Sequence, residues 1–228
     1  MRTIVEVQTP LLPDAEKYIA SIAGLDNFTA VVLEENGGIN AIVAASMLKQ
    51  RCDKRIFMKI ACRDRNRIAL YSELLTAATV GLFNLVLADG VHPLHTRFAA
   101  AKPVYEVDSL NLLRMIKHNS PGFGDATVPP LASFQWTIGV CIGGSTSADM
   151  ARAKKFAASG ADLFFACSLD AVSRLRLLTG NPIFLSVTKE QITDISEVLR
   201  EAESAGADGV NLIVKTPEKV LDGSIAAK

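Results

Sequence analysis

The sequence predicts a single α/β domain, a closed (βα)8 barrel of the TIM type that spans residues 1–228. Short runs rich in Val, Ile, Leu and Phe alternate with longer segments of helical period, which is typical of parallel strands covered by helices. The number of these runs is eight, as a closed barrel needs. In 158–163 and 204–209 a glycine stops a helical segment just before an apolar run, as at a helix C-terminus. An open, doubly wound sheet remains the structural alternative.

The apolar runs are the expected strands, in chain order. They cover residues 3–8, 30–34, 56–61, 84–88, 137–142, 163–167, 183–187 and 210–214. Helices are expected between them. The exception is 119–133, where several prolines and glycines exclude a helix and predict an irregular crossing before the fifth strand. The strands and helices resume after it with the same spacing, so no domain boundary is expected there.

Composition limits the possible partners and the compartment. The chain has 24 basic residues (Lys plus Arg) and 24 acidic residues (Asp plus Glu), so it carries no net charge. Overall charge therefore gives no reason to expect nucleic acid or an anionic membrane as a partner. No apolar stretch reaches the roughly 18 to 20 residues that span a bilayer, and no secretory signal is visible. The 4 cysteines are too few for a disulfide framework in a domain of this size. We therefore expect a cytoplasmic protein with reduced thiols.

In a barrel, chemistry belongs at the carboxyl ends of the strands, so polar residues there are candidates. Glu6 interrupts an apolar run and is expected to point into the barrel mouth, as a general acid or as a structural carboxylate paired with Lys59 or Lys215. The two lysines would also suit a Schiff-base lyase, because a desolvated lysine becomes nucleophilic. The residues alone leave these possibilities open.

Other features near strand ends are less specific. The arginine-rich run 62–67 opens a helix and suits either an anion or a solvated helix start with local ion pairs. The turn 143–147, with Asp149 after it, suits a phosphate but lacks the lysine of a P-loop. A thiolate metal site is one possibility for Cys62, Cys141 and Cys167, with His92 or His95 as a further ligand. Their spacing is unlike that of zinc sites, so no metal site is predicted.

Several segments resemble one known family. They are 62–70 with its Cys-Arg-Asp-Arg-Asn-Arg sequence, 81–87, 101–110 and 159–162. They occur in the order found in methylenetetrahydrofolate reductases, and 5–10 stands where that family has its opening Phe-Glu-Phe-Phe-Pro-Pro. The resemblance covers about residues 3 to 170. It implies a (βα)8 barrel, an FAD held across the strand ends, and reduction of methylenetetrahydrofolate or an analogous reduced pterin.

The resemblance also implies roles for individual residues. Glu6 matches the general acid, and Asp89 matches the aspartate that binds the pterin beside the flavin, although its Gly-Asp order is reversed here. The positions expected to hold FAD are Lys59, Leu87, Asp89, Val107, Asp149, Arg152 and Lys155. Other flavin positions depart from the family: Leu33 replaces a threonine, Ile142 a tyrosine and Cys167 a glutamine, while Lys59 replaces a histidine.

The chain is shorter than typical members after the sixth strand, where 188–205 provides one plain helix. This shortening predicts a more open site, or a partner subunit that closes it or donates electrons. A homo-oligomer is also possible. The alternatives to a flavin-dependent reductase are a flavin-free pterin-binding or methyl-transfer component, and the Schiff-base lyase that uses Lys59 or Lys215.

Overall fold

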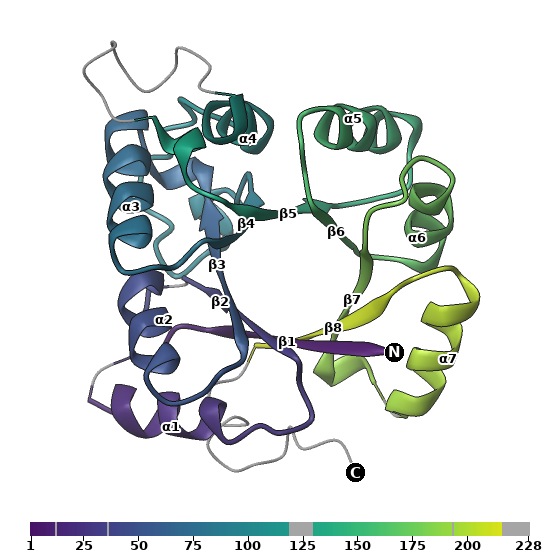
Figure 1. Cartoon of the computed structure of the whole chain (residues 1–228), viewed down its shortest axis with the longest axis horizontal. Coiled ribbons are helices and arrows are strands. Elements are labelled where there is room, and N and C mark those ends of the chain that lie inside the picture. Colours follow the sequence, from purple (N-terminus) through teal and green to yellow (C-terminus); the bar gives the residue numbers. More distant parts are fainter. Residues whose placement is uncertain (12, 36, 119–129, 193, 216–228) are drawn as a thin grey trace.

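The computed structural model describes residues 1–11, 13–35, 37–118, 130–192 and 194–215. Its strands form one closed barrel in which each pairs in parallel with its neighbours in chain order, and β8 pairs with β1. Figure 1 shows helices α1 to α7 arranged around the outside of this barrel. The predicted fold class is confirmed, and the open-sheet alternative is wrong because β1 and β8 are hydrogen-bonded.

The strand bounds agree with the predicted ones to within a residue at each end. The strands are β1 Arg2–Gln8, β2 Ala30–Glu34, β3 Arg55–Ala61, β4 Asn84–Ala88, β5 Thr137–Ile142, β6 Leu163–Ala166, β7 Ile183–Thr188 and β8 Gly209–Val214. The continuous apolar runs were sufficient to locate them, because strands buried on both faces carry apolar side chains on both.

Helices follow each of the first seven strands. They are α1 Ala15–Ala23, α2 Ala41–Lys49, α3 Arg67–Thr79, α4 Ser109–His118, α5 Ser147–Ala158, α6 Leu169–Arg176 and α7 Ile195–Ser204, with short 3-10 turns η1 Cys62–Asp64, η2 Pro93–His95, η3 Leu131–Ser133 and η4 Lys189–Gln191. Of the segment expected to be irregular, 119–129 lies outside the described residues, and the rest holds only η3. Within the described part of the chain, no helix has the length and apolar character to cross a membrane.

The two predicted glycine turns are built alike. Gly160 and Gly206 have φ of 89° and 93°, which glycine adopts at little cost. Two residues after each glycine, an aspartate accepts a hydrogen bond from the backbone of an earlier strand: Asp162 from Ile138 N at 2.7 Å, and Asp208 from Ile183 N at 2.9 Å. The Gly-Ala-Asp sequence therefore ends a helix and fastens the next strand to the barrel.

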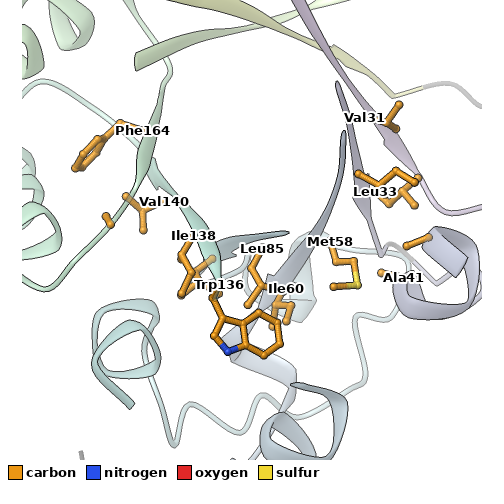
Figure 2. Packing of buried hydrophobic residues seen from close by; sticks show 14 of the residues in the cluster. Val31, Leu33, Ala41, Met58, Ile60, Leu85, Trp136, Ile138, Val140 and Phe164 are labelled. Atoms are coloured by element: carbon orange, nitrogen blue, oxygen red, sulfur yellow. The ribbon is translucent and has the colours of Figure 1, made fainter. Parts of the chain in front are cut away.

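The larger core lies between the strands and the helices. Alternate strand residues such as Leu33, Met58 and Leu85 point outward and pack with helix residues in one buried cluster. Figure 2 shows part of this cluster, with Trp136 beside Ile138 and Leu85. The indole Nε1 of Trp136 donates to Leu131 O at 2.8 Å, so the ring is buried without an unpaired donor.

The barrel interior changes from apolar to polar along its axis. The strand register and the tilt of the strands group inward-facing residues from alternate strands into layers of about four. Two lower layers consist of Ile4, Phe57, Gly139 and Phe184, then Val32, Val86, Phe165 and Asn211. The next layer toward the carboxyl ends consists of Glu6, Lys59, Cys141 and Ser186. These two lower layers, which are apolar except for Asn211, thus close the barrel beneath a polar layer at its mouth.

Candidate functional site

A lysine held between two carboxylates forms the centre of the polar layer. Lys59 Nζ lies 2.6 Å from Glu6 Oε1 and 2.8 Å from Glu34 Oε1. The side chains of Glu6 and Lys59 are 5% and 16% exposed, whereas that of Glu34 is 34% exposed. The three residues come from β1, β3 and β2, so parallel pairing of neighbouring strands is what brings them together. The pairing of the Glu6 carboxylate with Lys59, one of the possibilities that the sequence left open, is confirmed.

This arrangement determines the charge of the lysine. Burial lowers the pKa of Lys59, but the carboxylates of Glu6 and Glu34 outweigh it, and the net effect raises that pKa above its ordinary value. The ammonium form is therefore dominant at neutral pH. A Schiff base forms from the neutral amine, so Lys59 is poorly suited to be the nucleophile of a lyase. Lys215 is exposed just after β8.

Asn211 completes the surroundings of Glu6. Its Nδ2 donates to Glu6 Oε2 at 2.7 Å and lies 3.2 Å from Ser186 Oγ. The carboxylate of Glu6 is thus held at both oxygens, by Lys59 on one side and by Asn211 on the other. Sequence analysis missed Asn211, although it is a single polar residue within an apolar run, which is the signal that identified Glu6. Asn211 Oδ1 is buried and has no hydrogen-bond partner among the described residues.

Two of the cysteines near the strand ends, Cys141 and Cys62, remain neutral thiols. Burial raises the pKa of Cys141 to about 12, despite the nearby Lys59, and burial likewise raises the pKa of Cys62 to about 12. Cys167 is exposed and lies 2.8 Å from Gly143 O. In the described part of the chain no three or more His, Cys, Asp and Glu side chains form a group that could hold a metal ion. His92 and His95 are both exposed; His92 precedes η2 and His95 is its last residue.

Asp89 follows β4 and belongs to a separate polar group. Its Oδ1 accepts hydrogen bonds from Ser109 N at 2.8 Å and Ser109 Oγ at 2.7 Å, and its Oδ2 lies 2.6 Å from Arg152. Ser109 begins α4 and Arg152 belongs to α5, so Asp89 connects two helices at the barrel mouth. No contact between Asp89 and Glu6 is present. Asp89 and Arg152 are both about half exposed and accessible to a ligand.

The remaining positions expected to hold FAD do not form one surface. Leu87 and Val107 are buried in the outer core, with their side chains packed toward the helices. Asp149 accepts hydrogen bonds from Thr146 N and Oγ1 in a capping box at the start of α5. Lys155 lies 8 residues after Ser147, roughly 12 Å further along the helix. Together with a Lys59 that already holds two carboxylates, these residues do not fit a flavin site. FAD binding stays a prediction.

The arginine-rich run is occupied by ion pairs within the protein. Arg63 pairs with Asp64, Arg67 pairs with Glu106 at 2.5 Å, and Arg65 pairs with Glu35 and with Glu73. Glu35 also accepts a hydrogen bond from Ala41 N at the start of α2, at 2.6 Å. Of the two interpretations left open by the sequence, these contacts favour local ion pairs over an anion site.

Comparison with known proteins gives the fold. No family model matches the chain, and no curated protein matches it. Among solved structures, a tryptophan synthase from M. tuberculosis aligns with a TM-score of 0.66 at 12% identity, covering 98% of this chain and 85% of that one. A putative deoxyribose-phosphate aldolase from Coccidioides immitis gives 0.61 at 15% identity, covering 98% and 84%. The N-(5'-phosphoribosyl)anthranilate isomerase from Pyrococcus furiosus gives 0.53 at 11% identity, covering 96% and 95%.

These similarities correct the predicted activity. The sequence led us to expect a flavin-dependent methylenetetrahydrofolate reductase, but the three solved structures compared above are named as a synthase, an aldolase and an isomerase. The prediction of a flavin-dependent reductase is therefore contradicted. The misleading signal was the resemblance of a few short segments to that family. Several positions that hold flavin in the family carry residues of another type in this chain. The structural similarity establishes the (βα)8 barrel. At identities this low it does not give the reaction, which has to be argued from the residues of the site.

Proposed function

We propose that this protein is an enzyme that transfers protons, without a redox step, on a small substrate bound at the barrel mouth. The observation that supports the proposal is the contact of 2.6 Å between the buried Glu6 carboxylate and the Lys59 ammonium. Enzymes of this fold carry out their chemistry at the carboxyl ends of the barrel strands, and this acid–base pair lies there. By analogy with the aldolase and the isomerase that share the fold, the reaction class is a lyase or an isomerase.

The two groups have different roles in this proposal. Glu6 is the general base, which removes a proton from a carbon next to a carbonyl group. Lys59 remains protonated and stabilises the negative charge that develops on the carbonyl oxygen. Glu34 is more exposed than Glu6 and holds the ammonium from the solvent side. Asn211 fixes the second oxygen of Glu6 and thereby orients the base.

A reduced pterin is proposed as a separate ligand of the barrel mouth and not as the substrate of the proton transfer, because the carbon next to its ring carbonyl carries no hydrogen. A reduced pterin is the ligand implied by the resemblance of residues 3–170, and Asp89 is its expected contact. The exposed faces of Asp89 and Arg152 support this as a proposal, because a carboxylate and a guanidinium can together pair with the amide edge of a pterin ring. Titration with 5-methyltetrahydrofolate tests the proposed ligand. Asp89→Asn should weaken binding about ten-fold, corresponding to about 1.4 kcal/mol, whereas unchanged affinity would remove Asp89 from the site.

The proton-transfer proposal is tested by hydrogen exchange. The purified protein is incubated in D2O with 2-deoxyribose 5-phosphate, whose open-chain form carries hydrogens on the carbon next to its aldehyde, and proton NMR follows signal loss and product formation. We expect exchange or turnover with the unaltered protein and a loss of about 10²- to 10⁴-fold in Glu6→Gln, which is the usual contribution of a general base. Lys215→Gln is the matched control, because Lys215 lies outside the polar layer. Activity that survives Glu6→Gln would contradict the assigned role.

A further inference from the structure

A cavity opens at the end of the barrel opposite the polar layer. Its volume is about 390 Å³, and it lies among residues at the amino-terminal ends of the strands. Ile4, Phe57, Leu163 and Phe184 form its apolar wall. The Phe184 ring stacks on that of Phe165 in the layer above, with centroids 5.8 Å apart. These apolar layers separate the cavity from the polar layer around Lys59, so the two sites are independent.

The charge of this cavity is set by two arginines. Arg2 and Arg55 line it, and neither forms a salt bridge with any carboxylate in the described ranges. The guanidinium carbon of Arg2 lies 5.3 Å from the centroid of the Phe184 ring, which places a cation over an aromatic face.

Among the described residues that line the cavity, Asp162 is the one acidic residue. Its Oδ2 is engaged by Lys117 Nζ at 2.8 Å and by Ile138 N at 2.7 Å. Its negative charge is therefore compensated from the outer side of the barrel. The hydroxyl groups of Thr29 and Thr137 add neutral hydrogen-bonding groups at the wall. The cavity is thus apolar inside and positively charged at its rim.

We infer that this cavity binds a small aromatic carboxylate. Its volume lies at the lower end of the range for small-molecule sites, about 300 to 1,000 Å³. The ring of such a ligand would pack against Phe57 and Phe184, where its burial is favourable. The carboxylate would pair with Arg2 and Arg55, whose guanidinium groups can each bind it through two parallel hydrogen bonds. This function goes beyond the proton transfer proposed for the barrel mouth.

The test uses 1-naphthoate as the probe and isothermal titration calorimetry as the measurement. We expect saturable binding of one equivalent, and a loss of affinity of about ten-fold or more in Arg55→Gln and in Arg2→Gln. Arg174→Gln is the matched control, because Arg174 is an exposed arginine on α6 outside the cavity. The neutral analogue 1-naphthalenemethanol should bind at least ten-fold more weakly than the acid.

Three results would overturn the inference. The first is the absence of naphthoate binding up to its solubility limit. The second is an affinity of both arginine variants equal to that of the unaltered protein. The third is binding of the neutral alcohol as tight as that of the acid. Circular dichroism of each variant shows that a lost affinity does not reflect unfolding. Glu6 lies on the far side of the apolar layers, so failure of the proton-transfer proposal would leave this result unaffected.

Discussion

Removal of the Lys59 ammonium by Lys59→Met should destabilise the fold, because it leaves the Glu6 carboxylate buried without a counter-charge. Breaking a buried pair by removing one partner costs about 3 to 5 kcal/mol. The 16% exposure of Lys59 and the remaining bond from Asn211 favour the lower value, about 3 kcal/mol. With a urea dependence of about 3 kcal/mol per molar, the unfolding midpoint should fall by about 1 M.

The assay is equilibrium unfolding in urea, followed by the fluorescence of Trp136. This residue is the only tryptophan of the chain and is buried in the outer core. Glu6→Gln in the same protein provides the control, because it removes the uncompensated charge but keeps an acceptor for Asn211. The double variant Glu6→Gln/Lys59→Met should therefore lose less than the sum of the single variants, with a coupling of about 2 kcal/mol.

The pH dependence of this contribution has a definite sign. The pKa of Lys59 is raised in the folded state, so its contribution is fully present below the ordinary lysine value of 10.5 and is lost as the pH rises toward the raised value. The difference between the unaltered protein and Lys59→Met should stay constant from pH 7 to about pH 10. Equal stability of the two proteins, or additive losses in the double variant, would refute the reasoning about the buried pair.

Three further predictions concern other parts of the fold. Cys141 should resist a thiol reagent at pH 8 while exposed Cys167 reacts, because burial raises the pKa of Cys141 to about 12. A time course of labelling followed by mass spectrometry measures the two rates, and equal rates would contradict this prediction. Gly209→Ala should lower stability by about 1 to 3 kcal/mol or more, because a Cβ there would lie 2.4 Å from a backbone oxygen. Gly160→Ala meets no close contact and should cost about 1 kcal/mol of backbone strain. Thermal unfolding of the two variants compares these losses. Thr146→Ala should cost about 1 kcal/mol through loss of the α5 cap, and a midpoint equal to that of the unaltered protein would contradict the capping role.

The sequence was sufficient for the fold because its signals are local and repeated. Strands buried on both faces appear as apolar runs, and the Gly-Ala-Asp turns mark two of the junctions between helix and strand. The chain order of the strands then leaves few topologies, since parallel crossovers are right-handed and neighbouring strands pair. Residues 119–129, where the sequence predicted an irregular crossing, lie outside the described residues.

The site was only partly predictable, because its contacts join residues far apart in the chain. Glu6 and its partner Lys59 were identified as inward-facing polar residues, but Glu34 was not recognised as the second carboxylate on Lys59. Asn211 lies 205 positions after Glu6, and only closure of the barrel between β1 and β8 brings them together. The positions of Leu87 and Val107 were taken from a resemblance, and no sequence pattern indicated that their side chains pack into the outer core.

The protonation state of Lys59 at the barrel mouth decides between proton transfer and Schiff-base chemistry. It is measured directly by a pH titration of the lysine side-chain carbon resonances in the ¹³C-labelled protein, with Lys59→Met used to assign the signal. We expect no titration of Lys59 below about pH 10.5, because Glu6 and Glu34 raise its pKa above that ordinary value. A titration midpoint of Lys59 near neutral pH would contradict the proposed role and would restore Lys59 as a nucleophile.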